Sequence, residues 1–297
     1  MNVESKRFVD YYNEGIYSIN DIRDYMKASK ISEDGSAYEH LGLTKDEYDL
    51  WKQNKIVELS DILNAKKFKI EIINKAKRFF REEIAKSHEL NTKKLIKLKE
   101  FNLNPFLDKY KANFLTGNDS SESIAKALVY PRVLGTSINT TFGNKMQKFC
   151  SDVLEGFAST TSGIDIEFVD LTDGRKKYCQ IKAGPNTINK DDVDTIDRHF
   201  QAIKNLARTN NLNIGLNDLI VGVFYGEKDE LSGHYKNIQK TYPVYIGQDF
   251  WYRLTGDSEF YKKITDAIGE VATEYDSSEM LNKVIKELAK EIESKFK

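Results

Sequence analysis

Residues 163–184 read GIDIEFVDLTDGRKKYCQIKAG, and this pattern predicts two antiparallel β-strands joined by a tight turn. Apolar and polar residues alternate along GIDIEFVDL, as they do in a strand that buries one face. Asp173-Gly174 is a favoured two-residue hairpin turn, and KKYCQIKAG then continues as the second strand. The stretch therefore predicts a β-hairpin with one apolar face and one polar face.

The turn determines which residues lie opposite each other in the hairpin. With a two-residue turn, the opposed pairs are Val169 and Tyr178, Glu167 and Gln180, and Asp165 and Lys182. These side chains share one face, because opposed residues point to the same side of a sheet. The other face would hold Ile164, Ile166, Phe168, Cys179, Ile181 and Ala183, and we expect it to be buried. The polar face thus gathers two carboxylates, an amide and an ammonium group.

Two interpretations of this polar face are open. The first is a solvated outer surface with a cross-strand ion pair between Asp165 and Lys182. The second is a functional site. The abrupt end of the second strand at Gly184-Pro185-Asn186-Thr187 favours the site, because a loop there can approach a ligand.

An aspartate beside an amide and a lysine suits the metal-assisted hydrolysis of a phosphodiester. Mg²⁺ prefers oxygen ligands and keeps several waters. It polarises the phosphate and lowers the pKa of a bound water, while an adjacent lysine orients or helps to deprotonate that water and offsets the developing charge. Gln180 can bind a cation through its carbonyl oxygen, although more weakly than a carboxylate does.

Length and composition indicate a globular protein with a sizeable core. The chain has 297 residues, of which 40% are hydrophobic and 31% are charged. We expect a soluble protein, because the first residues lack the apolar core of a signal peptide and no run approaches the roughly 18 apolar residues of a membrane span. Cys150 and Cys179 are too few for a disulfide framework or a zinc cluster, which favours the reducing cytoplasm.

The net charge of −1 conceals an uneven distribution. Lysine and arginine minus aspartate and glutamate give −5 for residues 1–50, +10 for residues 51–150 and −6 for residues 151–297. The basic third of the chain suits a contact with the phosphate backbone of nucleic acid. A solvated helix face explains the same charges, so both interpretations are open.

Hydrophobic periodicity predicts an α/β protein with a helical N-terminal region. Helices are expected as short elements in residues 1–55, as one long amphipathic helix or two over 56–100, and at 123–135, 142–157, 191–208, 248–272 and 278–296. Coiled-coil pairing with a second copy is another use of the long helix. Two further strands are expected in DLIVGVFYG (218–226), buried on both faces, and in YPVYIG (242–247). Pro105, Gly117 and a polar cluster mark a boundary within residues 102–122.

The spacing of the hairpin residues resembles a nuclease motif. Asp165, a gap of fourteen residues and then Gln180-Ile181-Lys182 resemble the PD-(D/E)XK motif, and YCQIKAGPNTINKDD resembles the active-site strand and following loop of type II restriction endonucleases. The similarity covers residues 102–265 through NPF, LTG, YPRVLG, VGVFYG and YIGQDFW…LTGD, which resemble segments of enzymes that cut G/C-rich interrupted palindromes. The motif alone is degenerate, but the ordered series is more specific. The resemblance implies a mixed central sheet flanked by helices, and usually a homodimer with one active site for each DNA strand.

The resemblance also implies roles for the hairpin residues. Asp165 takes the place of a metal ligand, Lys182 that of the catalytic lysine, and Gln180 that of the second acidic residue. The backbone carbonyl of Ile181 would be a further metal ligand. Mg²⁺ is the cofactor that such a site implies.

Gln180 departs from the family pattern and leaves the metal site one charge short. Either the amide suffices, or a carboxylate comes from Glu167 or from Glu155 on the preceding helix. An inactive nuclease is the third alternative, although the presence of both Asp165 and Lys182 disfavours it.

Two further residues have open roles. His199, on the helix that follows the hairpin, is expected to be structural rather than a general base. Arg132 binds phosphate in one interpretation and forms a simple salt bridge in the other.

The sequence thus predicts a Mg²⁺-dependent type II restriction endonuclease that hydrolyses double-stranded DNA and leaves 5′-phosphate ends. Residues 1–101 would form a helical region that embraces DNA and helps to dimerise, and residues 102–297 would form the catalytic domain. DNA contacts are predicted for Lys93, Lys94, Lys97, Lys99, Asn186, Thr187 and Asn189. A homodimer is expected, as is a cognate DNA methyltransferase that acts on the same site without stable binding. The alternatives are a repair or structure-specific nuclease of the same fold and a DNA-binding protein with a vestigial nuclease site.

Overall fold

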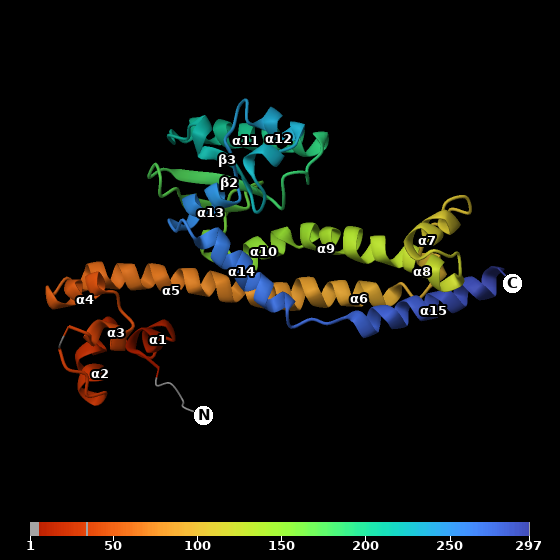
Figure 1. Cartoon of the computed structure of the whole chain (residues 1–297). Helices are drawn as coiled ribbons and strands as arrows, with labels where there is room; N and C mark the ends of the chain where they lie inside the picture. Colours follow the sequence, from red (N-terminus) through yellow and green to blue (C-terminus); the bar gives the residue numbers. More distant parts are fainter. Residues whose placement is uncertain (1–5, 34, 297) are drawn as a thin grey trace. The chain divides into compact units, whose positions relative to one another are not determined.

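The computed structural model of the chain describes residues 6–33 and 35–296 (Figure 1). The chain divides into two compact units, Met1–Ile72 and Ile73–Lys297. The predicted division between residues 101 and 102 stays a prediction. Within the described residues, we find no helix that is both long and apolar enough to cross a membrane.

Short helices form the first unit. They are α1 (Phe8–Asn13), η1 (Ile19–Asp21), α2 (Ile22–Ala28), α3 (Ala37–Leu41), α4 (Lys45–Lys52) and the first part of α5 (Ile56–Phe79). Their apolar sides share a core that includes Phe8, Leu41 and Leu59. A capping box begins α4, because the Glu47 N–H donates to Thr44 Oγ1 at 3.3 Å and the Thr44 N–H donates to Glu47 Oε2 at 2.9 Å. The group of short helices expected in residues 1–55 is confirmed.

Helices also make up most of the second unit. After α5 come η2 (Phe80–Ala85), α6 (Lys86–Lys94), η3 (Leu98–Glu100), α7 (Asp108–Thr116), α8 (Ser121–Tyr130), η4 (Pro131–Ser137), α9 (Ile138–Asn144), α10 (Met146–Asp152) and η5 (Glu155–Phe157). The segments α5, η2 and α6 continue one another, so the long helix expected over residues 56–100 is confirmed as far as Lys94. Both η2 and η4 are π-helical turns, a rare conformation that is frequent at functional sites.

A four-stranded mixed sheet lies in the second unit. Its strands are β1 (Ile166–Val169), β2 (Lys176–Lys182), β3 (Leu219–Val223) and β4 (Val244–Ile246), in the order β1-β2-β3-β4. The first two strands are antiparallel, whereas β2–β3 and β3–β4 are parallel. The remaining elements are α11 (Lys190–Thr209), η6 (Leu216–Asp218), η7 (Lys228–Glu230), α12 (Gly233–Ile238), α13 (Gln248–Thr255), α14 (Phe260–Ala272) and α15 (Ser278–Phe296). The expected α/β class, with a mixed sheet flanked by helices, is confirmed.

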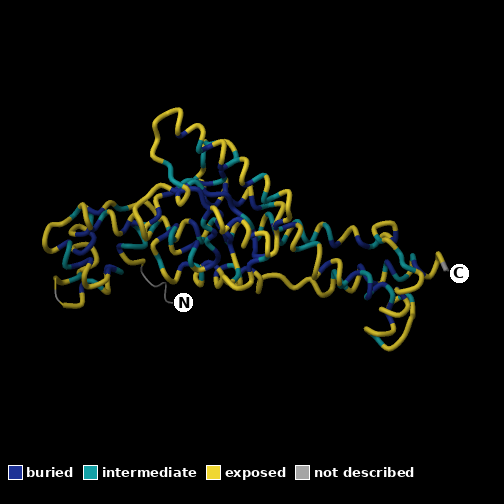
Figure 2. The backbone as a smooth tube through the Cα atoms, turned by 90° about the horizontal axis from the view of Figure 1, so that it is seen from above, coloured by how far each residue is buried: buried dark blue, intermediate teal, exposed yellow. Residues whose placement is uncertain are grey.

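Helices cover both faces of this sheet (Figure 1). On one face, α11 and α12 pack on β3 and β4 around Phe200, Val221 and Tyr235. On the other face, α13 places Phe250 against Gly222. Every residue of β3 is buried, as its continuous apolar run predicted. In Figure 2, which colours each residue by its burial, many buried residues gather in the middle of the chain trace.

The predicted register of the hairpin is wrong by two residues. The strands pair Ile166 with Cys179 and Glu167 with Tyr178, and Asp165, just before β1, donates its N–H to the Cys179 carbonyl rather than lying opposite Lys182. The turn is longer than predicted, because the Asp170 N–H already donates to the Arg175 carbonyl at 2.9 Å. A four-residue loop, Leu171–Gly174, therefore joins the strands.

Side chains of the turn explain its length. Asp170 is buried, and its Oδ1 accepts hydrogen bonds from the N–H and the hydroxyl of Thr172 at 2.8 and 2.7 Å. Arg253 of α13 donates to Asp170 Oδ2 at 2.8 Å. These bonds fix Asp170 as the start of the turn, whereas the sequence pattern had placed the turn at Asp173-Gly174.

Within β1 and β2, the predicted faces are unchanged by this shift. A shift of two residues leaves each side chain on its predicted side of the sheet, because the side-chain period of a strand is two. The predicted burial of Ile164, Ile166, Phe168, Cys179, Ile181 and Ala183 is confirmed, but Ile164, which lies before β1, packs with Phe200 and Val221 on the α11 side of the sheet and not on the predicted face. The interpretation of the polar face as a solvated surface is wrong at Gln180, which is buried beside α11.

Gly222 provides a test of the packing beneath the sheet. An added Cβ at this position would lie 2.4 Å from Phe250 Cε2 and 3.0 Å from Cys179 Sγ, and both neighbours are fully buried. We expect Gly222→Ala to lower the free energy of unfolding by about 1–3 kcal/mol through overpacking. Gly269→Ala in α14 is the matched control, because nothing lies within 4 Å of its added Cβ. That change should raise stability by about 0.5–1 kcal/mol. Equal effects of both changes in urea unfolding would contradict this packing.

Candidate active site

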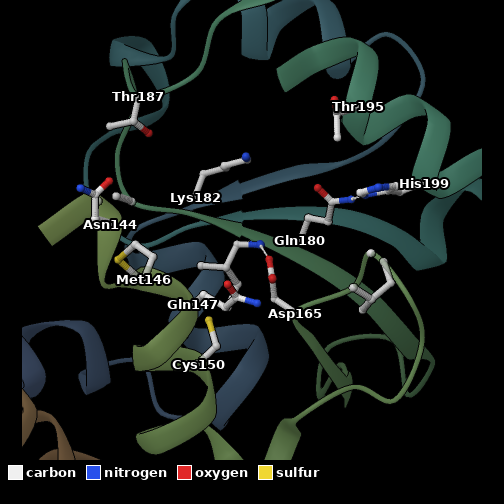
Figure 3. Close-up of a pocket in the computed structure, with 15 residues that line it drawn as sticks. Asn144, Met146, Gln147, Cys150, Asp165, Gln180, Lys182, Thr187, Thr195 and His199 are labelled. Carbon is white, nitrogen blue, oxygen red and sulfur yellow. Dashed lines mark hydrogen bonds between the residues drawn. The ribbon is translucent and has the colours of Figure 1, made fainter. Parts of the chain in front are cut away.

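A pocket of about 620 Å³ opens beside the C-terminal end of β2 (Figure 3). Its lining residues are Gly143, Asn144, Met146, Gln147, Cys150, Gly163, Ile164, Asp165, Gln180, Ile181, Lys182, Ala183, Thr187, Thr195 and His199. The three predicted catalytic residues, Asp165, Gln180 and Lys182, therefore reach the same pocket. They come from the hairpin, while α9, α10 and α11 supply the remaining walls.

Asp165 lies just before β1, and the backbone of β2 holds it in place. The Ile181 N–H donates to Asp165 Oδ2 at 2.6 Å, and the Asp165 N–H donates to the Cys179 carbonyl at 3.0 Å. Burial raises the pKa of the Asp165 carboxyl, while the Ile181 N–H, Lys182 and His199 act in the opposite direction. Because desolvation destabilises the charged carboxylate, a cation bound at its other oxygen would stabilise it.

Gln180 has a fixed orientation in the pocket. Its side-chain Nε2 lies 2.9 Å from Nδ1 of His199, which belongs to α11. With Nδ1 as the acceptor, His199 carries its proton on Nε2, and the amide oxygen of Gln180 is turned toward the pocket (Figure 3). Gly163 makes room for this imidazole, since a Cβ there would lie 2.6 Å from His199 Cγ. Its φ of +79° also favours glycine.

Lys182 forms an ion pair with Asp192 rather than with Asp165. Its Nζ lies 3.0 Å from Asp192 Oδ1. Asp192 is in the first turn of α11, where its Oδ2 accepts the Asn189 N–H and its own N–H donates to Asn189 Oδ1, both at 3.0 Å. Burial would raise the pKa of Asp192, but hydrogen bonds from the Asn189 N–H and Lys182 lower it overall. A carboxylate fixed in a capping box therefore holds the ammonium group of Lys182.

Neither glutamate considered as a second acid lines this pocket. Glu167 accepts a hydrogen bond from Thr161 Oγ1 at 2.7 Å and pairs with Lys176 at 2.6 Å. Glu155 lies in η5 with an exposed side chain and pairs with Lys75. Both carboxylates thus have partners away from Gln180.

The predicted DNA-contact residues of the loop after β2 have three different environments. Thr187 lines the pocket, and its hydroxyl donates to the Gly184 carbonyl at 2.9 Å. Asn189 is the N-cap of α11, where its side chain is already bonded. Asn186 is exposed on the loop. Thr187 and Asn186 are therefore available to a ligand, whereas Asn189 positions Asp192.

The four predicted DNA-contact lysines also differ. They are Lys93, Lys94, Lys97 and Lys99. Lys93 pairs with Glu89 at 2.5 Å, and Lys97 pairs with Glu291 at 3.3 Å. Lys94 and Lys99 form no ion pair within residues 6–33 and 35–296. Lys94 also lines a second cavity.

Two residues at this site were not found from the sequence. Asp192 was missed, although Asn189 followed three residues later by an acid is a capping-box signal. His199 was expected to be only structural, because the sequence does not indicate that α11 brings it to Gln180.

The oxygen donors in the pocket fit a hard cation. A strand residue points its N–H and C=O to the same side, so the Ile181 carbonyl faces the edge where its N–H meets Asp165. A cation in this pocket would have one carboxylate, the amide oxygen of Gln180 and this carbonyl as candidate ligands. Such a set suits Mg²⁺, which keeps several waters. The described residues contain no group of three or more histidine, cysteine, aspartate or glutamate side chains that could hold a metal ion.

Comparison with known proteins identifies the family. The model of a family described as Type II restriction endonuclease EcoO109I matches residues 66–276, a segment that includes every residue lining the pocket. No curated protein matches the chain. Because the family match covers most of the sequence, the chain belongs to the EcoO109I family of type II restriction endonucleases, which are DNA-cleaving hydrolases.

Proposed function

We propose that the protein is a Mg²⁺-dependent endonuclease that hydrolyses double-stranded DNA at specific sequences and leaves 5′-phosphate and 3′-hydroxyl ends. The observation that carries this proposal is the convergence of Asp165, Gln180 and Lys182 on one pocket, in a chain of the restriction endonuclease family. We infer further that the sheet and its flanking helices form a PD-(D/E)XK nuclease fold.

Three oxygens would hold the metal: the free carboxylate oxygen of Asp165, the amide oxygen of Gln180 and the carbonyl of Ile181. The chemistry supplied by a Mg²⁺ ion at these oxygens would be polarisation of the phosphate and a lower pKa of a bound water. With Gln180, the site has one negative charge, from Asp165. An acid at position 180 would give the site two negative charges. We therefore expect weak binding of Mg²⁺ and a high concentration requirement.

Lys182 and His199 prepare the site for the reaction. The ammonium group of Lys182 donates a hydrogen bond to the attacking water and so directs a lone pair of that water toward phosphorus. It also offsets the charge that develops on the phosphate. Asp192 holds this ammonium at 3.0 Å, and His199 holds the amide of Gln180 with its oxygen toward the pocket. Both α11 residues therefore position groups that act on the substrate.

Digestion of one DNA of known sequence tests the function. We expect the purified protein and Mg²⁺ to convert a plasmid into discrete fragments whose ends carry 5′-phosphate, and sequencing of those ends gives the recognition site. Cleavage confined to mismatched or branched DNA would indicate a repair or structure-specific nuclease instead. A wild-type control without divalent ions should leave the plasmid intact.

A non-cleaving DNA-binding protein is the second candidate, and Gln180 is the observation that favours it. The pocket holds only one carboxylate ligand, so its affinity for a metal could be too low for catalysis. Binding of DNA without cleavage in Mg²⁺ or Mn²⁺ would support this candidate.

The proposal also assigns different roles to the two parts of the chain. Residues 1–101 would embrace DNA and help to form a homodimer, and residues 102–297 would carry the chemistry. A cognate methyltransferase would protect the same recognition site without stable binding. Light scattering of the full chain should give the mass of a dimer, and a monomer mass would contradict the dimer.

A further inference from the structure

A second cavity lies next to the active-site pocket. Its volume is about 460 Å³. It is lined by Asn91, Lys94, Leu95, Glu100, Arg132, Thr136, Ser137, Thr140, Thr141 and Asn144. Asn144 also lines the active-site pocket, so the two cavities are neighbours. The lining combines two cations with hydroxyl and amide groups, which is the set of side chains that contacts DNA phosphates and sugars.

The π-helical turn η4 builds one wall of this cavity. Arg132, Thr136 and Ser137 are four and five residues apart, a spacing that places them on one side of a π turn. The wall is anchored from α6, where Nε2 of His88 lies 3.0 Å from the Val133 carbonyl. The unusual turn thus presents an arginine and two hydroxyls to the same space.

The cations in this cavity lack carboxylate partners. Arg132 forms neither an ion pair nor a side-chain hydrogen bond with any residue that the structure describes. The simple salt bridge considered from the sequence is therefore not formed there. Lys94 Nζ donates to Asn91 Oδ1 at 3.1 Å, which leaves its charge uncompensated. Glu100 is the one carboxylate in the lining, so the cavity carries a net positive charge.

We propose that this cavity binds a backbone phosphodiester of the DNA strand whose scissile phosphate lies in the Asp165 pocket. The inference rests on the proposed function. Arg132 and Lys94 pair with the phosphate, and the hydroxyls of Thr136, Ser137 and Thr140 donate to phosphate or sugar oxygens. Asn144, shared by both cavities, lies where the strand passes from one to the other. Such contacts fix the strand on the enzyme but do not distinguish bases.

The test measures DNA affinity in the absence of divalent ions, so it does not depend on cleavage. Fluorescence anisotropy with a labelled 20-base-pair duplex compares the full-length wild type with Lys94→Ala/Arg132→Ala over a range of salt concentrations. Lys204→Ala/Arg208→Ala in α11 is the matched control, because it removes one lysine and one arginine that lie outside both cavities.

We expect the cavity variant to bind about tenfold more weakly or worse, to cognate and random duplexes alike. For this variant, the slope of the logarithm of the binding constant against the logarithm of the salt concentration should be shallower by about two, with about one for each lost phosphate contact. The control should keep the wild-type salt slope, and Lys94→Arg/Arg132→Lys should recover most of the affinity. Melting curves identify any variant that fails to fold. If the alanine variant does not fold, the DNA affinity of Lys94→Arg/Arg132→Lys is compared with that of the wild type instead.

Three results would overturn the proposal. The first is equal affinity of the cavity variant and the control. The second is a loss confined to the cognate duplex, which would indicate base recognition. The third is that inorganic phosphate raises the melting temperature of the wild type but not of the cavity variant, while the DNA affinity of the cavity variant is unchanged. That result would indicate a site for free phosphate. A wild type that binds DNA but never cuts it contradicts the proposed function and leaves this binding test intact.

Discussion

Asp165→Ala and Lys182→Ala should each abolish DNA cleavage, with a loss of at least about 10³-fold in the single-turnover rate. In the proposed mechanism, Asp165 would provide the one carboxylate of the metal site, and Lys182 would provide the ammonium beside the attacking water. Neither side chain is expected to read bases, so sequence-specific binding should be largely retained. Cleavage is measured with saturating enzyme in Mg²⁺, and binding is measured in Ca²⁺ by anisotropy.

Two control variants separate chemistry from local damage. Lys190→Ala removes a nearby exposed positive charge at the start of α11 without touching the pocket, and it should cut at close to the wild-type rate. Asp165→Asn keeps the acceptor for the Ile181 N–H but removes the charge, and it should be as inactive as Asp165→Ala. Undiminished cutting by either alanine variant would remove the assignment of the active site.

The second prediction concerns Gln180 and the histidine that orients it. Gln180→Ala should impair cleavage, whereas Gln180→Glu should retain activity and lower the Mg²⁺ concentration needed for half the maximal rate. Loss of a side chain that orients a metal ligand typically costs about 10–100-fold in metal affinity or activity. We therefore expect His199→Ala to raise the Mg²⁺ requirement by about that factor, because the amide can then rotate its nitrogen into the pocket.

Combining Gln180→Glu with His199→Ala distinguishes a histidine that orients the amide from one that is merely structural. A carboxylate at position 180 has two equivalent oxygens, so its function does not depend on orientation by His199. In the Gln180→Glu background, His199→Ala should change the Mg²⁺ requirement little. In the wild-type background, the same change should raise the Mg²⁺ requirement by about the factor given above. Binding of Mn²⁺, followed by electron paramagnetic resonance, should show the same pattern without any cleavage.

Two outcomes would redirect the assignment. If His199→Ala raises the Mg²⁺ requirement equally in both backgrounds, His199 is a structural residue. Normal cutting by Gln180→Ala, together with an inactive Glu167→Ala or Glu155→Ala, would make the amide structural and give the second acidic position to that glutamate. In this structure both glutamates already have other partners, Lys176 for Glu167 and Lys75 for Glu155.

The side-chain alternation in residues 163–184 predicted that Asp165, Gln180 and Lys182 lie together, and all three line one pocket. That result did not depend on the exact register, because a slip of two residues preserves the side of every residue. Local signals likewise predicted the long helix, the buried strand β3 and the helix α11 within a few residues. That Asp165, Gln180 and Lys182 lie near one another was therefore predictable from local patterns.

What each polar group contacts was decided only by the tertiary structure. The loop length depends on Arg253, which is 83 residues from its partner Asp170 and reaches it only once α13 has packed under the sheet. The pairing of Lys182 with Asp192 and of Gln180 with His199 depends on where α11 crosses the strand. The cavity between α6 and η4 exists because a π turn faces a helix that is distant in sequence. Local propensity sets the face on which a side chain lies, but the partners on that face are set by long-range packing of apolar surfaces, which no short stretch of sequence encodes.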